Sequence, residues 1–210
     1  KLNDLKITSM HYQNSLGTDL YVEKPADNIW LNLDKKDKLG HQMIANMPSY
    51  EIFTSPNKYK TNGIVYSSKP LFYNDICINN FSLTFASGAV TGVRAENGQQ
   101  ILENMILSHE NGGYLGEIAL VSYNSPISNT GIVFNNTLFD ENASCHLALG
   151  HGFPKCVPNF DKKNGNELEQ IGVNKSSLHT DFMIGTPDLS IEADTVEGKK
   201  LILKNGNFNL

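Results

Sequence analysis

The feature that most constrains the fold is a series of short segments in which apolar and polar residues alternate. Residues 19–23 (DLYVE) and 62–68 (NGIVYSS) show this alternation, and Asn, Gly, Pro and Asp separate such segments. Successive side chains of a β-strand point to opposite faces, so the pattern predicts strands that bury one face. Tight turns in residues 87–88 (SG) and 197–198 (EG) predict two hairpins. The same reading predicts strands in residues 5–8, 28–33, 69–75, 115–123, 130–134 and 176–185, and short strands within residues 80–97 on both sides of the turn at residues 87–88.

Two segments interrupt this pattern and suggest helices. Ile101 and Met105 are spaced by one helical turn and precede a Gly-Gly pair, which predicts a helix that ends before residue 112. Residues 139–153 (FDENASCHLALGHGF) also suit a helix, which would place His146 in its middle. Residues 157–175 are polar and loop-like. The expected class is α+β, strand-rich, with mainly antiparallel sheets or a partly closed barrel and a few helices.

Composition excludes several classes of function. The chain has 210 residues, 40% of them hydrophobic, and a net charge of −5, so it can bury a core and carries no basic stripe for nucleic acid. No apolar run approaches the roughly 18–20 residues of a membrane span, and no signal-peptide pattern opens the chain. The chain has three cysteines, an odd number without close pairs, which favours free thiols in a reducing cytoplasm. We therefore expect a cytoplasmic protein without a nucleic-acid or membrane partner.

Residues 177–185 (SLHTDFMIG) contain the first candidate functional residues. His179 and Asp181 are two positions apart in a predicted strand, so their side chains project to the same side. A lone pair of this kind is more often a hydrogen-bonded structural pair than a metal site. Further potential ligands in similar apolar surroundings shift the balance toward a metal.

Three further residues meet that description. Glu117 lies in a run of core-type residues (YLGEIALV), where an unpaired carboxylate would cost several kcal/mol and needs a cation. His146 has apolar neighbours, and Glu51 stands beside Ile52 and Phe53. Each one taken singly also fits an ordinary polar residue at the edge of a core, so spacing alone supports a metal site only weakly.

Four stretches carry a resemblance to a known family. MPSYEIFTSPNK, LGEIALV, SPISNTGIVFNNTLFDENASCHLALG and SLHTDFMIG, at residues 47–58, 115–121, 125–150 and 177–185, resemble the signature blocks of the thermophile-type metalloaminopeptidases. The blocks keep the family's order across nearly the whole chain. The resemblance implies a two-metal exopeptidase. Because that family has an N-terminal α/β domain, residues 1–210 would be the C-terminal catalytic domain of a longer aminopeptidase, which would also explain the abrupt start without Met.

The resemblance also implies the ligand set and its chemistry. Two divalent ions, Zn, Co or Mn, would share a bridging carboxylate and activate a water molecule that attacks the peptide bond. The substrates would be peptides with a free N-terminus, and the full-length protein would form a homodimer. The implied ligands are Glu51, Glu117 as the bridge, His146, His179 and Asp181.

Two positions leave questions about the reaction. Glu110 matches a glutamate of the family and is a candidate general base, although a solvated acid at a helix end is the simpler interpretation. Phe153 stands where the family usually has Tyr, so the hydroxyl that such a Tyr would offer is missing unless Tyr123 or another group replaces it. The alternative function is an isolated metal-binding or dimerisation domain with little activity of its own. A Cys145–His146 dyad is disfavoured, because neighbours on a helix point about 100° apart.

Overall fold

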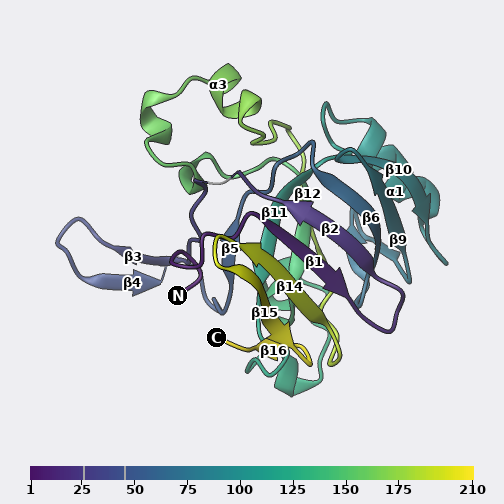
Figure 1. Cartoon of the computed structure of the whole chain (residues 1–210). Coiled ribbons are helices and arrows are strands. Elements are labelled where there is room, and N and C mark those ends of the chain that lie inside the picture. Colours follow the sequence, from purple (N-terminus) through teal and green to yellow (C-terminus); the bar gives the residue numbers. More distant parts are fainter. Residues whose placement is uncertain (26, 45) are drawn as a thin grey trace.

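The computed structural model describes residues 1–25, 27–44 and 46–210. Two antiparallel sheets form most of the fold, and two separate hairpins flank them (Figure 1). In spatial order the large sheet contains β10 (Ala89–Arg94), β9 (Ser82–Ala86), β6 (Thr61–Tyr66), β2 (Asp19–Glu23), β1 (Ser9–Gln13), β14 (Ser190–Thr195), β15 (Gly198–Lys204) and β16 (Asn207–Phe208). The small sheet contains β13 (His179–Met183), β12 (His146–Gly150), β11 (Leu115–Leu120) and β5 (Ile52–Thr54). The hairpins are β3 (Asp34–Lys36) with β4 (Gln42–Ile44) and β7 (Leu71–Tyr73) with β8 (Ile76–Ile78).

The expected α+β, mainly antiparallel class is confirmed. Each strand pairing among the described residues is antiparallel, and three α-helices accompany the sheets. The large sheet ends at β10 on one side and at β16 on the other, so these residues form no closed barrel. The helices are α1 (Gln99–Leu107), α2 (Thr137–Asp140) and α3 (Gly165–Gln170).

Burial follows the alternation that the sequence shows. In β2, Leu20 and Val22 are buried while the residues between and beside them are exposed, so this strand packs one face on the core. Every residue of β11 and β12 is buried, because these strands lie in the middle of the small sheet and are covered on both faces. Phe81 and Phe182 pack with ring centroids 5.7 Å apart and join the two sheets.

The prediction of a helix in residues 139–153 is wrong. The α-helix ends at Asp140, one short 3-10 turn follows, and His146–Gly150 form strand β12. A strand buried on both faces has a continuous apolar run instead of alternation, and such a run cannot be told from a buried helix by its pattern. The helix predicted around Ile101 and Met105 is confirmed as α1.

Several loops also differ from expectation. Residues 5–8, 28–33 and 130–134 are not strands, and the second of these segments contributes only a bridge between Leu31 and Phe53. Within the expected loop 157–175, α3 begins at a capping box in which Asn164 and Glu167 accept each other's backbone N–H groups. The spacing of these two residues was a usable signal for a helix start.

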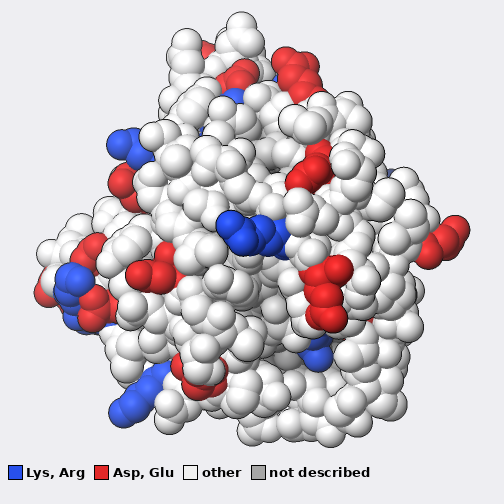
Figure 2. All heavy atoms as spheres, turned by 90° about the vertical axis from the view of Figure 1, so that its right-hand side faces the viewer, with Lys and Arg blue, Asp and Glu red and all other residues white. Residues whose placement is uncertain are grey.

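The surface carries scattered charges. On the face in Figure 2, acidic and basic side chains stand among uncharged atoms without forming a large field of one sign. Among the described residues, no helix combines the length and apolar character needed to cross a bilayer. The two ends of the chain meet, because Lys1 Nζ donates to the carbonyl oxygen of Leu210 at 3.0 Å.

The predicted turn at Ser87 and Gly88 is confirmed, and the second hairpin turns one residue earlier than expected, at Val196 and Glu197, so that Gly198 begins β15. The two glycines give a test of the fold. Gly88 has a φ of +85° and its Cα faces the Lys58 carbonyl so closely that a Cβ would collide with it, whereas Gly198 has a φ of +105° and open space. Gly198→Ala should lower the free energy of unfolding by about 1–2 kcal/mol through backbone strain alone. Gly88→Ala should cost more, because the β9–β10 turn must also move. Urea unfolding compares the two, and equal losses would contradict the crowding at Gly88.

Candidate metal centre

Strand register places the predicted ligands on one face of the small sheet. Ala148 of β12 is opposed by Glu117 on β11 and by Asp181 on β13. His146 precedes Ala148 by two residues and His179 precedes Asp181 by two, so these side chains project to the same side. The i, i+2 relation predicted for His179 and Asp181 is therefore confirmed.

Glu51 reaches the same face from the edge strand. Phe53 of β5 pairs with Ala119, which in turn pairs with His146, so the side chain two residues before Phe53 points toward His146. The carboxylate oxygen Oε2 of Glu51 lies 3.0 Å from Nε2 of His146. Both side chains are buried.

The five side chains form two groups that share one acid. Glu51, Glu117 and His146 make one group, in which one potential ligand atom per residue lies within 4.8 Å of the others. His179 and Asp181 make the second group with Glu117 under the same limit. His179 Nε2 lies 3.3 Å from Glu117 Oε2 and 3.4 Å from Asp181 Oδ1. The carboxylate of Glu117 thus lies between the groups, as a bridging ligand would.

A cavity of about 230 Å³ opens over these side chains. One part of its wall is apolar, with Phe153 packed on Phe53 at a centroid distance of 4.9 Å and on His179 at 5.2 Å. The remainder is mostly acidic and imidazole groups. The lining residues besides the five potential ligands are Leu33, Asn46, Phe53, Glu141 and Phe153.

Burial and the neighbouring charges shift the pKa values of the acids in the cavity. Burial raises the pKa of Glu117 to about 7, although the hydrogen bond with His179 acts in the opposite direction. Burial and the neighbouring carboxylates, Asp181 first among them, raise the pKa of Glu141 to about 8. Burial would also raise the pKa of Asp181, but His179 and His146 hold it below its ordinary value. The site concentrates negative charge that a cation would neutralise.

The pKa values of both imidazoles are raised as well, but by the neighbouring acids and not by burial. Burial would lower the pKa of His146, but Glu51, Glu117 and Asp181 outweigh it and raise that pKa to about 10. The pKa of His179 rises to about 11, because Asp181 and Glu117 outweigh desolvation in the same way. Protons therefore occupy the place that a metal ion would take between these groups.

The donor set fits divalent metal ions. Asp181 Oδ1 is buried and has no hydrogen-bond donor among the residues that the structure describes, although His179 Nε2 lies nearby. A buried carboxylate oxygen without a donor is costly unless a cation lies against it. Carboxylate oxygens and imidazole nitrogens without thiolate suit Zn, Co or Mn.

The sequence interpretation missed one acid of the cavity, Glu141, and proposed another, Glu110, that the structure places outside it. Glu141 lines the cavity, and its position five residues before His146 in the DENASCH stretch was the available signal. Glu110 is exposed and does not line the cavity; its backbone carbonyl accepts a hydrogen bond from Ser176 Oγ at 2.7 Å. A catalytic role for Glu110 stays a prediction.

Of the remaining candidate residues, one lines the cavity and two do not. Phe153 lines the cavity and Tyr123 does not, so Tyr123 supplies no hydroxyl there. Cys145 lies immediately before β12 and its thiol contacts the backbone of Val121 at 3.2 Å. Neighbouring strand residues point to opposite faces, which argues against a Cys145–His146 dyad more strongly than a helix would.

The raised imidazole pKa values predict proton-coupled metal binding. Ligation needs neutral imidazole, so zinc binding at pH 7 should release about two protons from His146 and His179. Zinc affinity should therefore fall as the pH falls, because more protons compete for the same nitrogen atoms. Calorimetric titration in buffers with different ionisation enthalpies measures the released protons. A binding enthalpy that is independent of the buffer would contradict this prediction.

Comparison with known proteins agrees with this arrangement. The chain is 43% identical over 208 residues to aminopeptidase AmpS of Bacillus subtilis (strain 168) and 36% identical to aminopeptidase PepS of Streptococcus thermophilus. Each match covers 99% of this chain and 50% of the relative. The chain therefore spans about half the length of these curated relatives.

Solved structures give the same result. Wild-type AmpT from Thermus thermophilus superimposes with a TM-score of 0.90 and 30% identity, over 100% of this chain and 51% of that one. A 2,5-dihydroxypyridine dioxygenase from Pseudomonas putida KT2440, at 14% identity and a TM-score of 0.65, shares the fold alone. The family model for thermophilic metalloprotease (M29) matches residues 1–208. The chain belongs to the M29 family of thermophilic metalloproteases.

Proposed function

We propose that this chain is the metal-binding catalytic domain of an aminopeptidase, which releases N-terminal residues from peptides by means of two divalent ions. The observation that carries the proposal is the pair of ligand groups that share Glu117 inside one cavity. The names of the relatives support the reaction class. Their double length supports a second domain in the whole protein, as the sequence interpretation expects.

The potential ligands form two sets within the cavity, one for each ion. Glu51 and His146 would hold one ion, His179 and Asp181 the other, and Glu117 would hold both together. When bound, such a pair of ions lowers the pKa of a water molecule and polarises the scissile carbonyl. Because the cavity is small and walled by Phe53 and Phe153, it admits a chain end more readily than the middle of a folded chain.

Proton transfer needs a group that carries a proton near neutral pH. Burial and the neighbouring carboxylates raise the pKa of Glu141, which lines the cavity, to about 8, and two bound cations would bring it back toward neutral pH. Glu141 can therefore give a proton to the leaving amine and regain one from water. Glu110 remains the alternative proposed from the sequence, but its exposed position outside the cavity gives it less support.

The apolar wall of the cavity affects the expected rate of hydrolysis. Phe153 presents a ring edge to His179 without a hydroxyl, so a developing oxyanion on the substrate lacks a donor from this position. The other members of the wall, Phe53 and Leu33, are also apolar. The missing donor would affect kcat more than the class of reaction.

The alternative proposal is a domain that holds metal but has little activity alone. A homodimer and the remaining half of a longer protein could complete the pocket in that case. Metal analysis together with peptide hydrolysis, measured on this chain and on the full-length protein, distinguishes the two proposals. Metal without hydrolysis in this chain, together with hydrolysis by the full-length protein, would favour the alternative.

Glu117→Gln tests the bridging role. The change keeps the size of the side chain but removes the charge that both ions share, so bound metal should fall below two ions per chain. Hydrolysis of a chromogenic leucine anilide should fall at least 100-fold. Far-UV circular dichroism should stay nearly unchanged. Glu23→Gln, an exposed strand glutamate of the large sheet, is the control; full activity and metal content in Glu117→Gln would refute the bridge.

Phe153→Tyr tests the missing hydroxyl. If the hydroxyl reaches the developing oxyanion, kcat should rise roughly tenfold while metal content stays the same. Phe53→Tyr adds a hydroxyl to the neighbouring ring of the same wall and should give no such rise. Steady-state kinetics with the leucine anilide compares the three proteins. An unchanged kcat in Phe153→Tyr would show that this position does not limit the reaction.

A further inference from the structure

The orientation of His179 depends on a backbone carbonyl. His179 Nδ1–H donates to the carbonyl oxygen of His151 at 2.7 Å, while Nε2 faces Glu117 and Asp181. A metal-binding histidine commonly donates its second ring N–H to such an acceptor, which fixes both the tautomer and the plane of the ring. The position of the His151 carbonyl therefore sets the direction of one potential metal ligand.

That carbonyl lies in a crowded place at the end of β12. A Cβ on Gly116 would collide with the carbonyl oxygens of Gly150 and His151, and β11 shifts its register next to Gly116. Gly150 has a φ of +97°, and a Cβ there would collide with the Leu178 carbonyl. The chain can turn at this point only because two glycines allow the backbones to approach.

Asn174 holds this turn from both sides of His151. Its side-chain Nδ2 group donates to the carbonyl oxygen of Gly150 at 2.6 Å, and its backbone carbonyl accepts from Gly152 N–H at 2.8 Å. The same Nδ2 group donates to the carbonyl of Asn111 at 3.0 Å. The side chain is 1% exposed and does not line the metal cavity.

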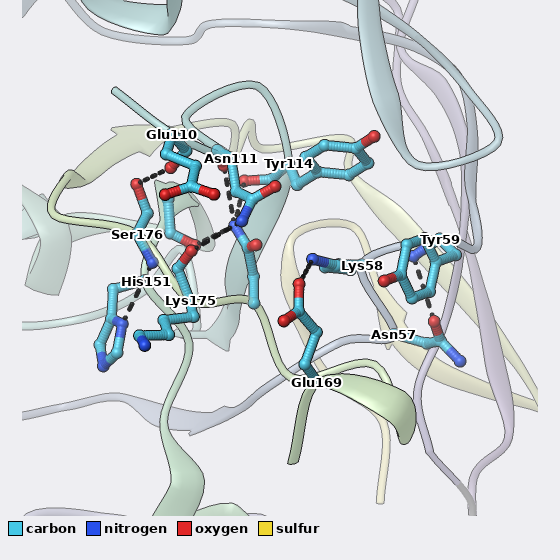
Figure 3. A network of polar contacts seen from close by, with 12 residues as sticks. Asn57, Lys58, Tyr59, Glu110, Asn111, Tyr114, His151, Glu169, Lys175 and Ser176 are labelled. Carbon is cyan, nitrogen blue, oxygen red and sulfur yellow. Dashed lines mark hydrogen bonds and ion pairs between the residues drawn. The ribbon is translucent and has the colours of Figure 1, made fainter. Parts of the chain in front are cut away.

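The surrounding contacts keep Asn174 in place. Figure 3 shows Glu110, Asn111 and Tyr114 on one side of His151, Lys175 and Ser176. Ser176 Oγ donates to the Glu110 carbonyl at 2.7 Å, and Asn111 Nδ2 donates to the Lys175 carbonyl at 3.0 Å. The loop after α1 and the segment before β13 are thereby joined, and Asn174 lies where they meet the end of β12.

We infer that Asn174 is a positioning residue for the metal site, which acts on His179 through the carbonyl of His151. The inference rests on the proposed function, because His179 must bind a metal for its orientation to matter. Loss of the Asn174 side-chain amide would remove its bond to the Gly150 carbonyl, loosen the turn at residues 150–152 and weaken the hydrogen bond to His179 Nδ1, while the backbone bond to Gly152 remains. The effect should be confined to the ion held by Glu117, His179 and Asp181.

Asn174→Ala in the full-length protein tests the inference with two measurements. Competitive titration with zinc should show a 10- to 100-fold weaker affinity for the ion at His179, the loss typical of removed supporting contacts, and a change of less than about twofold for the ion at Glu51 and His146. In the zinc-loaded protein, ¹H–¹⁵N spectra should show the Nδ1 proton of His179 protected in the wild type and exchanging rapidly in the variant. If Asn174→Ala does not fold, Asn174→Leu keeps the approximate size of the side chain and removes the amide donor.

The control separates positioning from general loss of stability. Thr18→Val removes a buried hydroxyl that accepts from Tyr66 N–H at 3.0 Å in the large sheet. It should lower the melting temperature and leave both zinc affinities and the Nδ1 proton unchanged. Unchanged zinc affinity in Asn174→Ala, or an equal loss of zinc affinity in Thr18→Val, would overturn the positioning role of Asn174 and leave the proposed function standing. If His179→Ala leaves the zinc titration of the wild type unaltered, the proposed function fails and the inference fails with it.

Discussion

The structure depends on burying three carboxylates and the imidazole of His146 on one face of a four-stranded sheet, with the more exposed imidazole of His179 beside them. Two charges taken out of water are stable only when each finds a well-placed partner. Ala148 supplies the geometry, because its small side chain lies between Glu117 and Asp181 on the neighbouring strands. A shift of one residue in either pairing would turn an acid into the apolar core on the opposite face.

The same arrangement explains how the fold tolerates these charged groups. Carboxylates raise the pKa values of His146 and His179, and the imidazoles in turn stabilise the acids, so the charges compensate one another within the sheet. The apolar wall of Phe53 and Phe153 keeps the surroundings poor in water, where electrostatic interactions are strong. Membership of the M29 family is consistent with this chemistry.

The sequence predicted the members of the site better than the elements that carry them. His179 and Asp181 were placed correctly, because alternation in a strand is local information. His146 was assigned to a helix, because a strand covered on both faces loses its alternation and only tertiary packing distinguishes the two. Glu141 was missed although it stands close to His146 in the sequence, because only the tertiary structure shows that the turn after α2 folds back over the sheet. The simpler interpretation of Glu110, a solvated acid at a helix end, agrees with its exposed position outside the cavity.

The hairpin of β3 and β4 has a consequence for engineering. Its strands pair only with each other, and its tip extends away from the body of the protein (Figure 1). Every residue of both strands is exposed, so a peptide inserted at the tip would meet neither sheet. The hairpin therefore offers a place for a purification tag that leaves the metal-binding face of the small sheet intact.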